Sequence, residues 1–164
     1  MLDIEEQGGA ALAALLGVAE PETWPPEHND ADTRAWLRGI MAAHLGDTDY
    51  AGWYIVALGG LVGTCGYTGP ADAAGKVEIG YAVIPGAQRR GYATRAVQLL
   101  ITRAFRDPRV NVVVAHTLAA AIASQRVLHG CGFVQTDSRI DPKEGEMLEF
   151  SLQRSAIGNI DCPR

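Results

Sequence analysis

Residues 78–94 limit the fold of this chain more than any other segment, because they join a strand, a basic loop and a helix without interruption. The strand is predicted at Val77 to Ile84, where apolar residues alternate, and Pro85-Gly86 ends it by removing a backbone donor. The amides of the first helical turn are unpaired, and the helix dipole adds positive potential there. This corner therefore predicts a site for an anion such as a pyrophosphate, and Gly91 allows the ligand to approach the backbone.

Apolar periodicity predicts the other elements and a mixed α/β fold. The helix after the loop should end near Asp107-Pro108; its apolar stripe consists of Ala93, Ala96, Val97, Leu100, Ile101, Ala104 and Phe105. Further helices are predicted at Ala10 to Val18, at Asp30 to Leu45 with Asp30 or Asp32 as the cap, and at Ile122 to Gly130. Further strands are predicted at Trp53 to Leu58 and Leu61 to Thr68, joined through Gly59-Gly60, and at Val110 to His116, Phe133 to Arg139 and Glu146 to Leu152. This order predicts a mixed sheet with helices on both faces and a right-handed parallel crossover from Ile84 to Val110.

The composition indicates one globular domain over residues 1–164. A hydrophobic content of 48% with 20% charged residues argues against disorder, and the apolar runs are shorter than the ~20 residues of a membrane helix. The net charge of -5 disfavours a nucleic-acid surface, which is normally basic. Cys65, Cys131 and Cys162 lack paired spacing, which predicts reduced thiols and no metal site. Since the start of the chain shows no basic leader, we expect a cytoplasmic protein with neither a membrane nor a nucleic-acid partner.

Two ordered motifs resemble the GNAT superfamily of N-acetyltransferases. Gln88-Arg89-Arg90-Gly91-Tyr92-Ala93 matches the Q/R-x-x-G-x-G/A signature that holds the pyrophosphate of acetyl-CoA, and Ala115 to Phe133 resembles the later strand, helix and Gly-Phe of that family. The likeness is closest to the branch of the ribosomal-protein N-terminal acetyltransferases, and it covers roughly Trp53 to Arg154. It implies a twisted, mostly antiparallel sheet of about six or seven strands flanked by about four helices. Residues 1–50 would then be variable helices, 53–154 the cofactor-binding core and 155–164 a loose tail.

The resemblance implies acetyl-CoA as cosubstrate and assigns it a set of residues. In the family the strand before the loop splays from its neighbour, and the pantetheine arm pairs with its exposed backbone near Val83. The implied cofactor-binding residues are Val83 and Ile84 through their amides, then Gln88, Arg89, Arg90, Gly91, Tyr92, Ala93 and Thr94, with Ser124 from the second motif. The alternatives are a solvated basic turn before a helix and, for Ser124, a hydroxyl that satisfies local backbone.

Glu78 is the candidate general base, because the family places a carboxylate at this strand position facing the cleft. Its alternative role is an ion pair with a neighbouring Lys or Arg across the strands. No Tyr follows Tyr92, so the sequence assigns no group that protonates the departing thiolate. The family's Asn before the second helix is Ala121 here, which either weakens cofactor binding or shifts its role to His116 or Thr117.

Three functions are compatible with these residues. The first is direct acetyl transfer from acetyl-CoA to a primary amine, either a small molecule or a peptide N-terminus. The second is a catalytically silent acyl-CoA sensor, and the third an unrelated nucleotide-binding or structural domain, against which stands the absence of Walker and G-x-G-x-x-G patterns. By analogy with the family, a homodimer through the late strands is expected.

Overall fold

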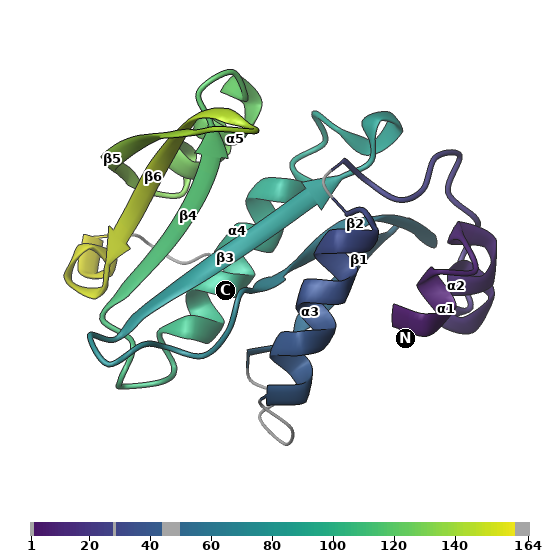
Figure 1. Cartoon of the computed structure of the whole chain (residues 1–164), viewed down its shortest axis with the longest axis horizontal. Coiled ribbons are helices and arrows are strands. Elements are labelled where there is room, and N and C mark those ends of the chain that lie inside the picture. Colours follow the sequence, from purple (N-terminus) through teal and green to yellow (C-terminus); the bar gives the residue numbers. More distant parts are fainter. Residues whose placement is uncertain (1, 28, 44–49, 160–164) are drawn as a thin grey trace.

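The computed structural model describes residues 2–27, 29–43 and 50–159, which form a six-stranded sheet with helices on both faces (Figure 1). The elements are α1 (Leu2–Glu5), α2 (Gly9–Leu16), α3 (Ala31–Ala43), β1 (Gly52–Ala57), β2 (Gly60–Tyr67), β3 (Lys76–Val83), the 3-10 helix η2 (Pro85–Ala87), α4 (Tyr92–Ala104), β4 (Val112–Leu118), α5 (Ile122–Gly130), β5 (Val134–Asp141), β6 (Gly145–Gln153) and the 3-10 helix η3 (Arg154–Asn159). The predicted α/β class and the sequence of core elements are confirmed.

The strands lie in the order β1-β2-β3-β4-β6-β5. All neighbouring pairs are antiparallel except β3 and β4, which are parallel and joined through α4. The parallel crossover that the strand-loop-helix pattern predicts is therefore confirmed. It brings the carboxyl ends of β3 and β4 to the same edge of the sheet, next to the start of α4.

The main core lies between the sheet and α4, which is drawn behind β3 in Figure 1, whereas α3 lies in front of the sheet. Val97 and Leu100 of α4 are buried against Val77 and Ile79 of β3. Side chains alternate along a strand, so Glu78, between these two buried residues, projects from the opposite face. Apolar periodicity thus fixes the direction of the one carboxylate that the sequence singles out.

Two predicted boundaries differ from the structure for local reasons. The hairpin turn is Leu58-Gly59, with φ of 51° and 75°, because Ala57 pairs with Gly60; the predicted Gly59-Gly60 turn is one residue late. Residues 154–159 form η3 where a loose tail is expected, and the Arg154 guanidinium anchors them by donating to the carbonyls of Phe105, Asp107 and Val110. Asp30 is the cap of α3, since its carboxylate accepts the Thr33 amide at 2.8 Å, and predicted helix residues 44–45 lie outside the described residues.

Candidate active site

A gap in strand pairing opens between β3 and β4. The two strands pair only at Lys76 with Val112, Val77 with Val113 and Glu78 with Val114, although β3 continues to Val83 and β4 to Leu118. Figure 1 shows the two strands diverging from this short ladder. On its other side β3 stays paired with β2 as far as Val83. One edge of β3 therefore presents peptide groups without a strand partner beyond Glu78.

The register of β2 and β3 determines which peptide groups face this gap. The Ile84 amide donates to the Val62 carbonyl at 3.0 Å, and the Ile84 side chain is buried. The predicted use of the Ile84 amide for a cofactor is therefore wrong. In an antiparallel ladder this bond makes Gly63 and Val83 a non-hydrogen-bonded pair, so the Val83 peptide group points away from β2 and into the gap.

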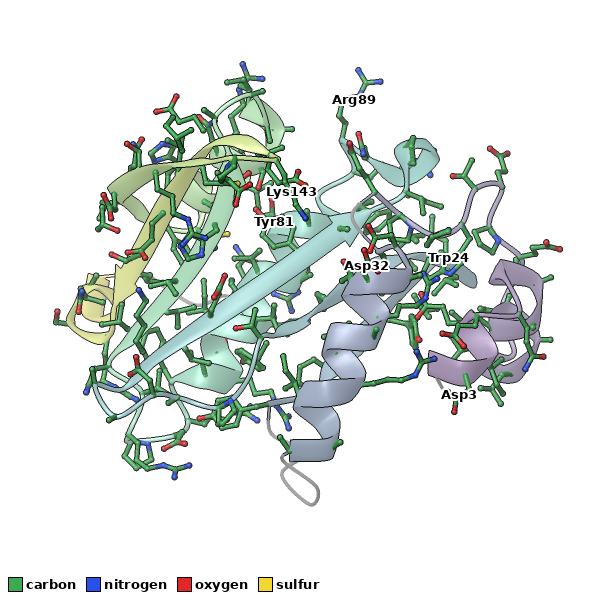
Figure 2. All side chains as sticks on the ribbon, viewed as in Figure 1. Asp3, Trp24, Asp32, Tyr81, Arg89 and Lys143 are labelled. Carbon is green, nitrogen blue, oxygen red and sulfur yellow. The ribbon has the colours of Figure 1, made fainter. Side chains whose placement is uncertain are left out.

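In the loop between β3 and α4, the amides of Ala87 and Gln88 donate to the carbonyls of Ile84 and Pro85 at 3.0 and 3.2 Å. The Gln88 side chain donates to the Val83 carbonyl at 3.1 Å, which ties the loop to the strand end. Arg89 and Gly91 have positive φ of 59° and 80°, and open space surrounds the position where Gly91 would carry a Cβ. Arg89 and Arg90 are exposed, and Figure 2 shows Arg89 projecting from the loop.

The first turn of α4 offers a row of donors to an anion. Among the described residues, no acceptor takes up the amides of residues 89–94, and the first turn contains no acidic residue or side-chain cap. The Tyr92 side chain packs beside Ile84 and Ala87, while Ala93 and Thr94 are half-buried. Unpaired amides at a helix start, left-handed loop residues and two arginines fit a pyrophosphate.

On the opposite face of the sheet, Glu78 belongs to a polar network that spans four strands, β3, β4, β6 and β5. Its Oε1 lies 2.8 Å from His116 Nδ1 on β4, and its Oε2 lies 3.4 Å from Thr68 Oγ1. The Glu78 side chain is 37% exposed, so the carboxylate still reaches solvent. The Lys or Arg partner considered from the sequence is not what the structure places beside Glu78, because its ionisable neighbour is His116.

The network continues to Glu149 of β6, which lies opposite His116 in the β4–β6 ladder. Glu149 Oε2 lies 3.4 Å from His116 Nε2 and 2.9 Å from Lys76 Nζ, and Glu149 Oε1 accepts from Thr136 at 3.1 Å. The Lys76 hydrogen bond, aided by that of Thr136, holds the pKa of Glu149 below its ordinary value of 4.5. Glu149 is therefore ionised at neutral pH.

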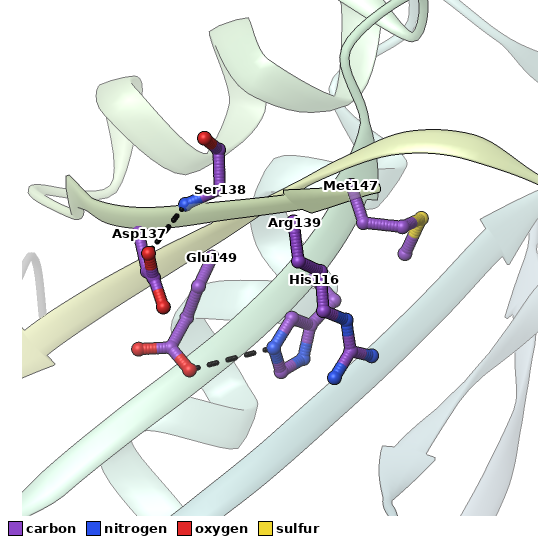
Figure 3. Close-up of a pocket in the computed structure, with 6 residues that line it drawn as sticks. All are labelled: His116, Asp137, Ser138, Arg139, Met147 and Glu149. Carbon is purple, nitrogen blue, oxygen red and sulfur yellow. Dashed lines mark hydrogen bonds and ion pairs between the residues drawn. The ribbon is translucent and has the colours of Figure 1, made fainter. Parts of the chain in front are cut away.

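A small open hollow adjoins this network (Figure 3). Its lining consists of His116, Asp137, Ser138, Arg139, Met147 and Glu149, and its cavity volume is about 50 Å³. This volume has room for a few water molecules and not for a coenzyme arm. In Figure 3 the imidazole of His116 lies in the hollow with its ring toward Glu149.

The second motif meets β3 on the α4 side of the sheet. The Ser124 hydroxyl of α5 lies 2.9 Å from the Tyr81 hydroxyl of β3, so its partner is a residue distant in sequence and not local backbone. Burial raises the pKa of Tyr81 to about 12, which keeps this phenol protonated at neutral pH. Sequence reasoning missed Tyr81; its only signal is the alternation that places it on the buried side with Ile79.

The turn before α5 is held without the family's asparagine. Ala121 makes no side-chain cap, and the Gln125 amide donates to the carbonyls of Ala119 at 2.8 Å and Leu118 at 3.3 Å. His116 is engaged by Glu78, and Thr117 is buried. Gln125 therefore orders this turn, which neither His116 nor Thr117 does.

The described residues contain no group of three or more His, Cys, Asp or Glu side chains able to hold a metal ion. Within the same residues, no helix combines the length and apolar character that crossing a membrane requires.

The sequence of this chain is similar to those of known acetyltransferases. Residues 8–134 match a family model described as an acetyltransferase (GNAT) domain. An uncharacterized N-acetyltransferase of Bacillus subtilis (strain 168), YjdG, is 29% identical over 136 residues, which cover 82% of this chain and 80% of that protein.

Solved structures share the fold at lower identity. RimL, a ribosomal L7/L12 α-N-protein acetyltransferase in complex with coenzyme A, superposes with a TM-score of 0.65 at 17% identity. The match covers 76% of this chain and 73% of the RimL chain. Spermidine N-acetyltransferase from Vibrio cholerae, in complex with CoA and spermine, has a TM-score of 0.63 at 14% identity, with 77% and 78% covered.

Proposed function

Because the chain belongs to the GNAT acetyltransferase family, we propose that it transfers the acetyl group of acetyl-CoA to a primary amine by direct attack. The observation that carries this proposal is the continuity of three features along one edge of β3. The unpaired amides at the start of α4 lie next to the peptide groups of β3 that have no partner on β4. Glu78 lies at the other end of these peptide groups along β3. Each of the three supplies one requirement of the reaction: an anchor, a guide and a base.

The anchor is the loop before α4. Amides of residues 89–94 would donate to the pyrophosphate, and Arg89 and Arg90 would supply positive charge to its oxygens. The guide is the Val83 peptide group, whose amide faces the gap and would pair with the pantetheine arm. When bound, acetyl-CoA supplies an activated acetyl group as a thioester.

The base is Glu78, which would take a proton from the acceptor ammonium directly or through one water. Its partly exposed carboxylate keeps Oε2 in only a long contact with Thr68, so this oxygen is accessible to a proton donor. On the other face, the Tyr81 phenol, protonated and in contact with Ser124, would donate a hydrogen bond to the departing thiolate. These two faces would keep the acidic and basic steps apart.

Proteins of the same fold indicate a general class of acceptor for this chain. Among proteins of the same fold are a spermidine N-acetyltransferase and a ribosomal-protein α-N-acetyltransferase. A small-molecule amine or a peptide N-terminus is therefore the class that we propose for this chain.

Calorimetry with CoA and thiol release from acetyl-CoA, measured against a panel of primary amines and peptides, test the proposal. Arg90→Ala should weaken CoA binding by about threefold to tenfold, the equivalent of one lost hydrogen bond. Arg106→Ala removes an equally exposed arginine just beyond the other end of α4 and is the matched control. Equal loss in both variants would move the binding site elsewhere. CoA binding without thiol release on any acceptor would support the silent sensor, and no CoA binding would exclude both functions.

A further inference from the structure

His116 lies between two carboxylates, one on each ring nitrogen. Nδ1 is 2.8 Å from Glu78 Oε1 and Nε2 is 3.4 Å from Glu149 Oε2. The imidazole is 19% exposed, so these two contacts rather than bulk water determine its orientation. The ring therefore links the candidate base on β3 to a second carboxylate on β6.

The hydrogen-bonding capacities of the groups determine where the protons are. An ionised carboxylate only accepts, so the 2.8 Å contact requires a proton on Nδ1. At 3.4 Å the Nε2 contact to Glu149 is too long to require the same in every charge state of the ring. The proton on Nδ1 is thus common to the neutral ring and the imidazolium, and the donation to Glu78 persists in both.

We propose that His116 is a positioning residue for Glu78: its Nδ1–H holds one carboxylate oxygen and leaves the other directed at the acceptor amine. This inference rests on the proposed function. A base must be aimed within hydrogen-bonding reach of the proton that it removes, and a misplacement of about 1 Å can cost on the order of 100-fold in rate. A histidine that fixes the carboxylate by one short contact prevents such a loss.

In this arrangement Glu149 is a fixed neighbour of the imidazole rather than a second base. Lys76 and Thr136 hold its carboxylate, and it lies opposite His116 in the β4–β6 ladder, so its Oε2 faces Nε2 and accepts from that nitrogen only when Nε2 also carries a proton. The charged and titratable groups that surround the ring are Lys76 and Glu78 on β3, Glu149 on β6, and Asp137 and Arg139 on β5, which line the same hollow.

Two amide variants at one position separate the two ring nitrogens. The side-chain nitrogen of Asn in His116→Asn lies close to where Nδ1 does, whereas the longer Gln in His116→Gln reaches the place of Nε2. Both remove the imidazole and leave the backbone of β4 unchanged, so each is the control for the other. His116→Asn should retain kcat within about threefold, and His116→Gln should lower it about tenfold to 100-fold with the same KM for acetyl-CoA.

The pH dependence adds a readout that a purely structural role would not change. In His116→Gln the acid limb of the kcat/KM profile should move to higher pH, because a donor that favours the ionised carboxylate is gone, while His116→Asn should keep the wild-type limb. Equal kcat losses and equal profiles for the two variants would overturn the inference. Thermal unfolding and CoA calorimetry on both variants identify any loss that comes from misfolding.

A second measurement is independent of activity and distinguishes this inference from the proposed function. Nitrogen-15 NMR of histidine-labelled protein, with the His116 signal identified by its absence from His116→Gln, reports which ring nitrogen carries the proton. A protonated Nδ1 in the wild type supports the inference even if no amine is acetylated. The absence of acetylation would contradict only the proposed function. An unprotonated Nδ1 at neutral pH overturns the inference even in an active enzyme.

Discussion

Replacement of Glu78 by Gln should remove catalysis while leaving the protein folded and able to bind its cosubstrate. Gln has the same shape, and its amide oxygen can still accept from His116 Nδ1, which lies 2.8 Å from the carboxylate. The loss in stability is then the difference between a charged and a neutral hydrogen bond at a site that is 37% exposed, on the order of 0.5–1 kcal/mol. CoA binding should be unchanged, because the anion site is at the start of α4.

The expected loss in rate is much larger than the loss in stability. General base catalysis contributes about 100-fold to 10,000-fold, which corresponds to about 2.7–5.4 kcal/mol of the activation barrier at about 1.36 kcal/mol for each factor of ten. The assay is thiol release from acetyl-CoA at saturating amine across pH, beside a CoA titration by calorimetry. Glu78→Gln should lower kcat and abolish the acid limb of the profile.

An unchanged profile with an unchanged rate would refute the reasoning, because Glu78 would then have no part in proton transfer. A matched loss of CoA affinity would refute it in another way, since it would place the effect at the binding site. Thr68→Val is the control: it removes the 3.4 Å contact to Glu78 Oε2 and leaves the carboxylate in place. Its kcat should fall less than that of Glu78→Gln.

Four further outcomes are expected. Gly91→Val should cost about 1–2 kcal/mol of stability, because φ is 80° there, and calorimetry should show weakened CoA binding. Tyr81→Phe should lower kcat about tenfold with little change in CoA affinity, as measured by thiol release; an unchanged kcat would remove the phenol from the mechanism. Arg154→Met should lower the free energy of unfolding in urea by about 1–3 kcal/mol, since it leaves carbonyls without their donor. Because Lys76 depresses the Glu149 pKa below 4.5, the stability from this pair is present above that pH and is lost as the pH falls further; Glu149→Gln should flatten this part of the thermal unfolding profile against pH.

The sequence predicts the strand, loop and helix of residues 77–104 well, because local rules determine them. The apolar stripe of α4, the proline after β3 and the glycine at the helix start act over a few residues each, and the structure has the strand, loop and helix where these signals place them. The side of the sheet from which Glu78 projects follows from the same alternation. A period of two along a strand is visible in sequence, and burial of Val77 and Ile79 fixes its phase.

The partners of Glu78 could not be predicted, because they depend on register between strands distant in sequence. Glu149 lies beside His116 only because the β4–β6 ladder pairs these two positions, and a shift of one residue would place it on the other face. Tyr81 and Ser124 meet through the packing of α5 beside β3, which is also a contact between residues distant in sequence. Gln125 orders the turn before α5 through a side chain whose rotamer no sequence pattern specifies.

Three residue pairs join β3 to β4 at the centre of the sheet, and beyond them the two strands have no hydrogen bonds to each other. If the proposed function is correct, the coenzyme arm would occupy this gap as an additional strand would. It would connect the β1-β2-β3 half of the sheet to the β4-β6-β5 half through hydrogen bonds that the protein alone does not make. Occupancy by the cosubstrate would then raise the melting temperature and slow deuterium exchange of the bordering amides, so that the enzyme would be stiffest when loaded.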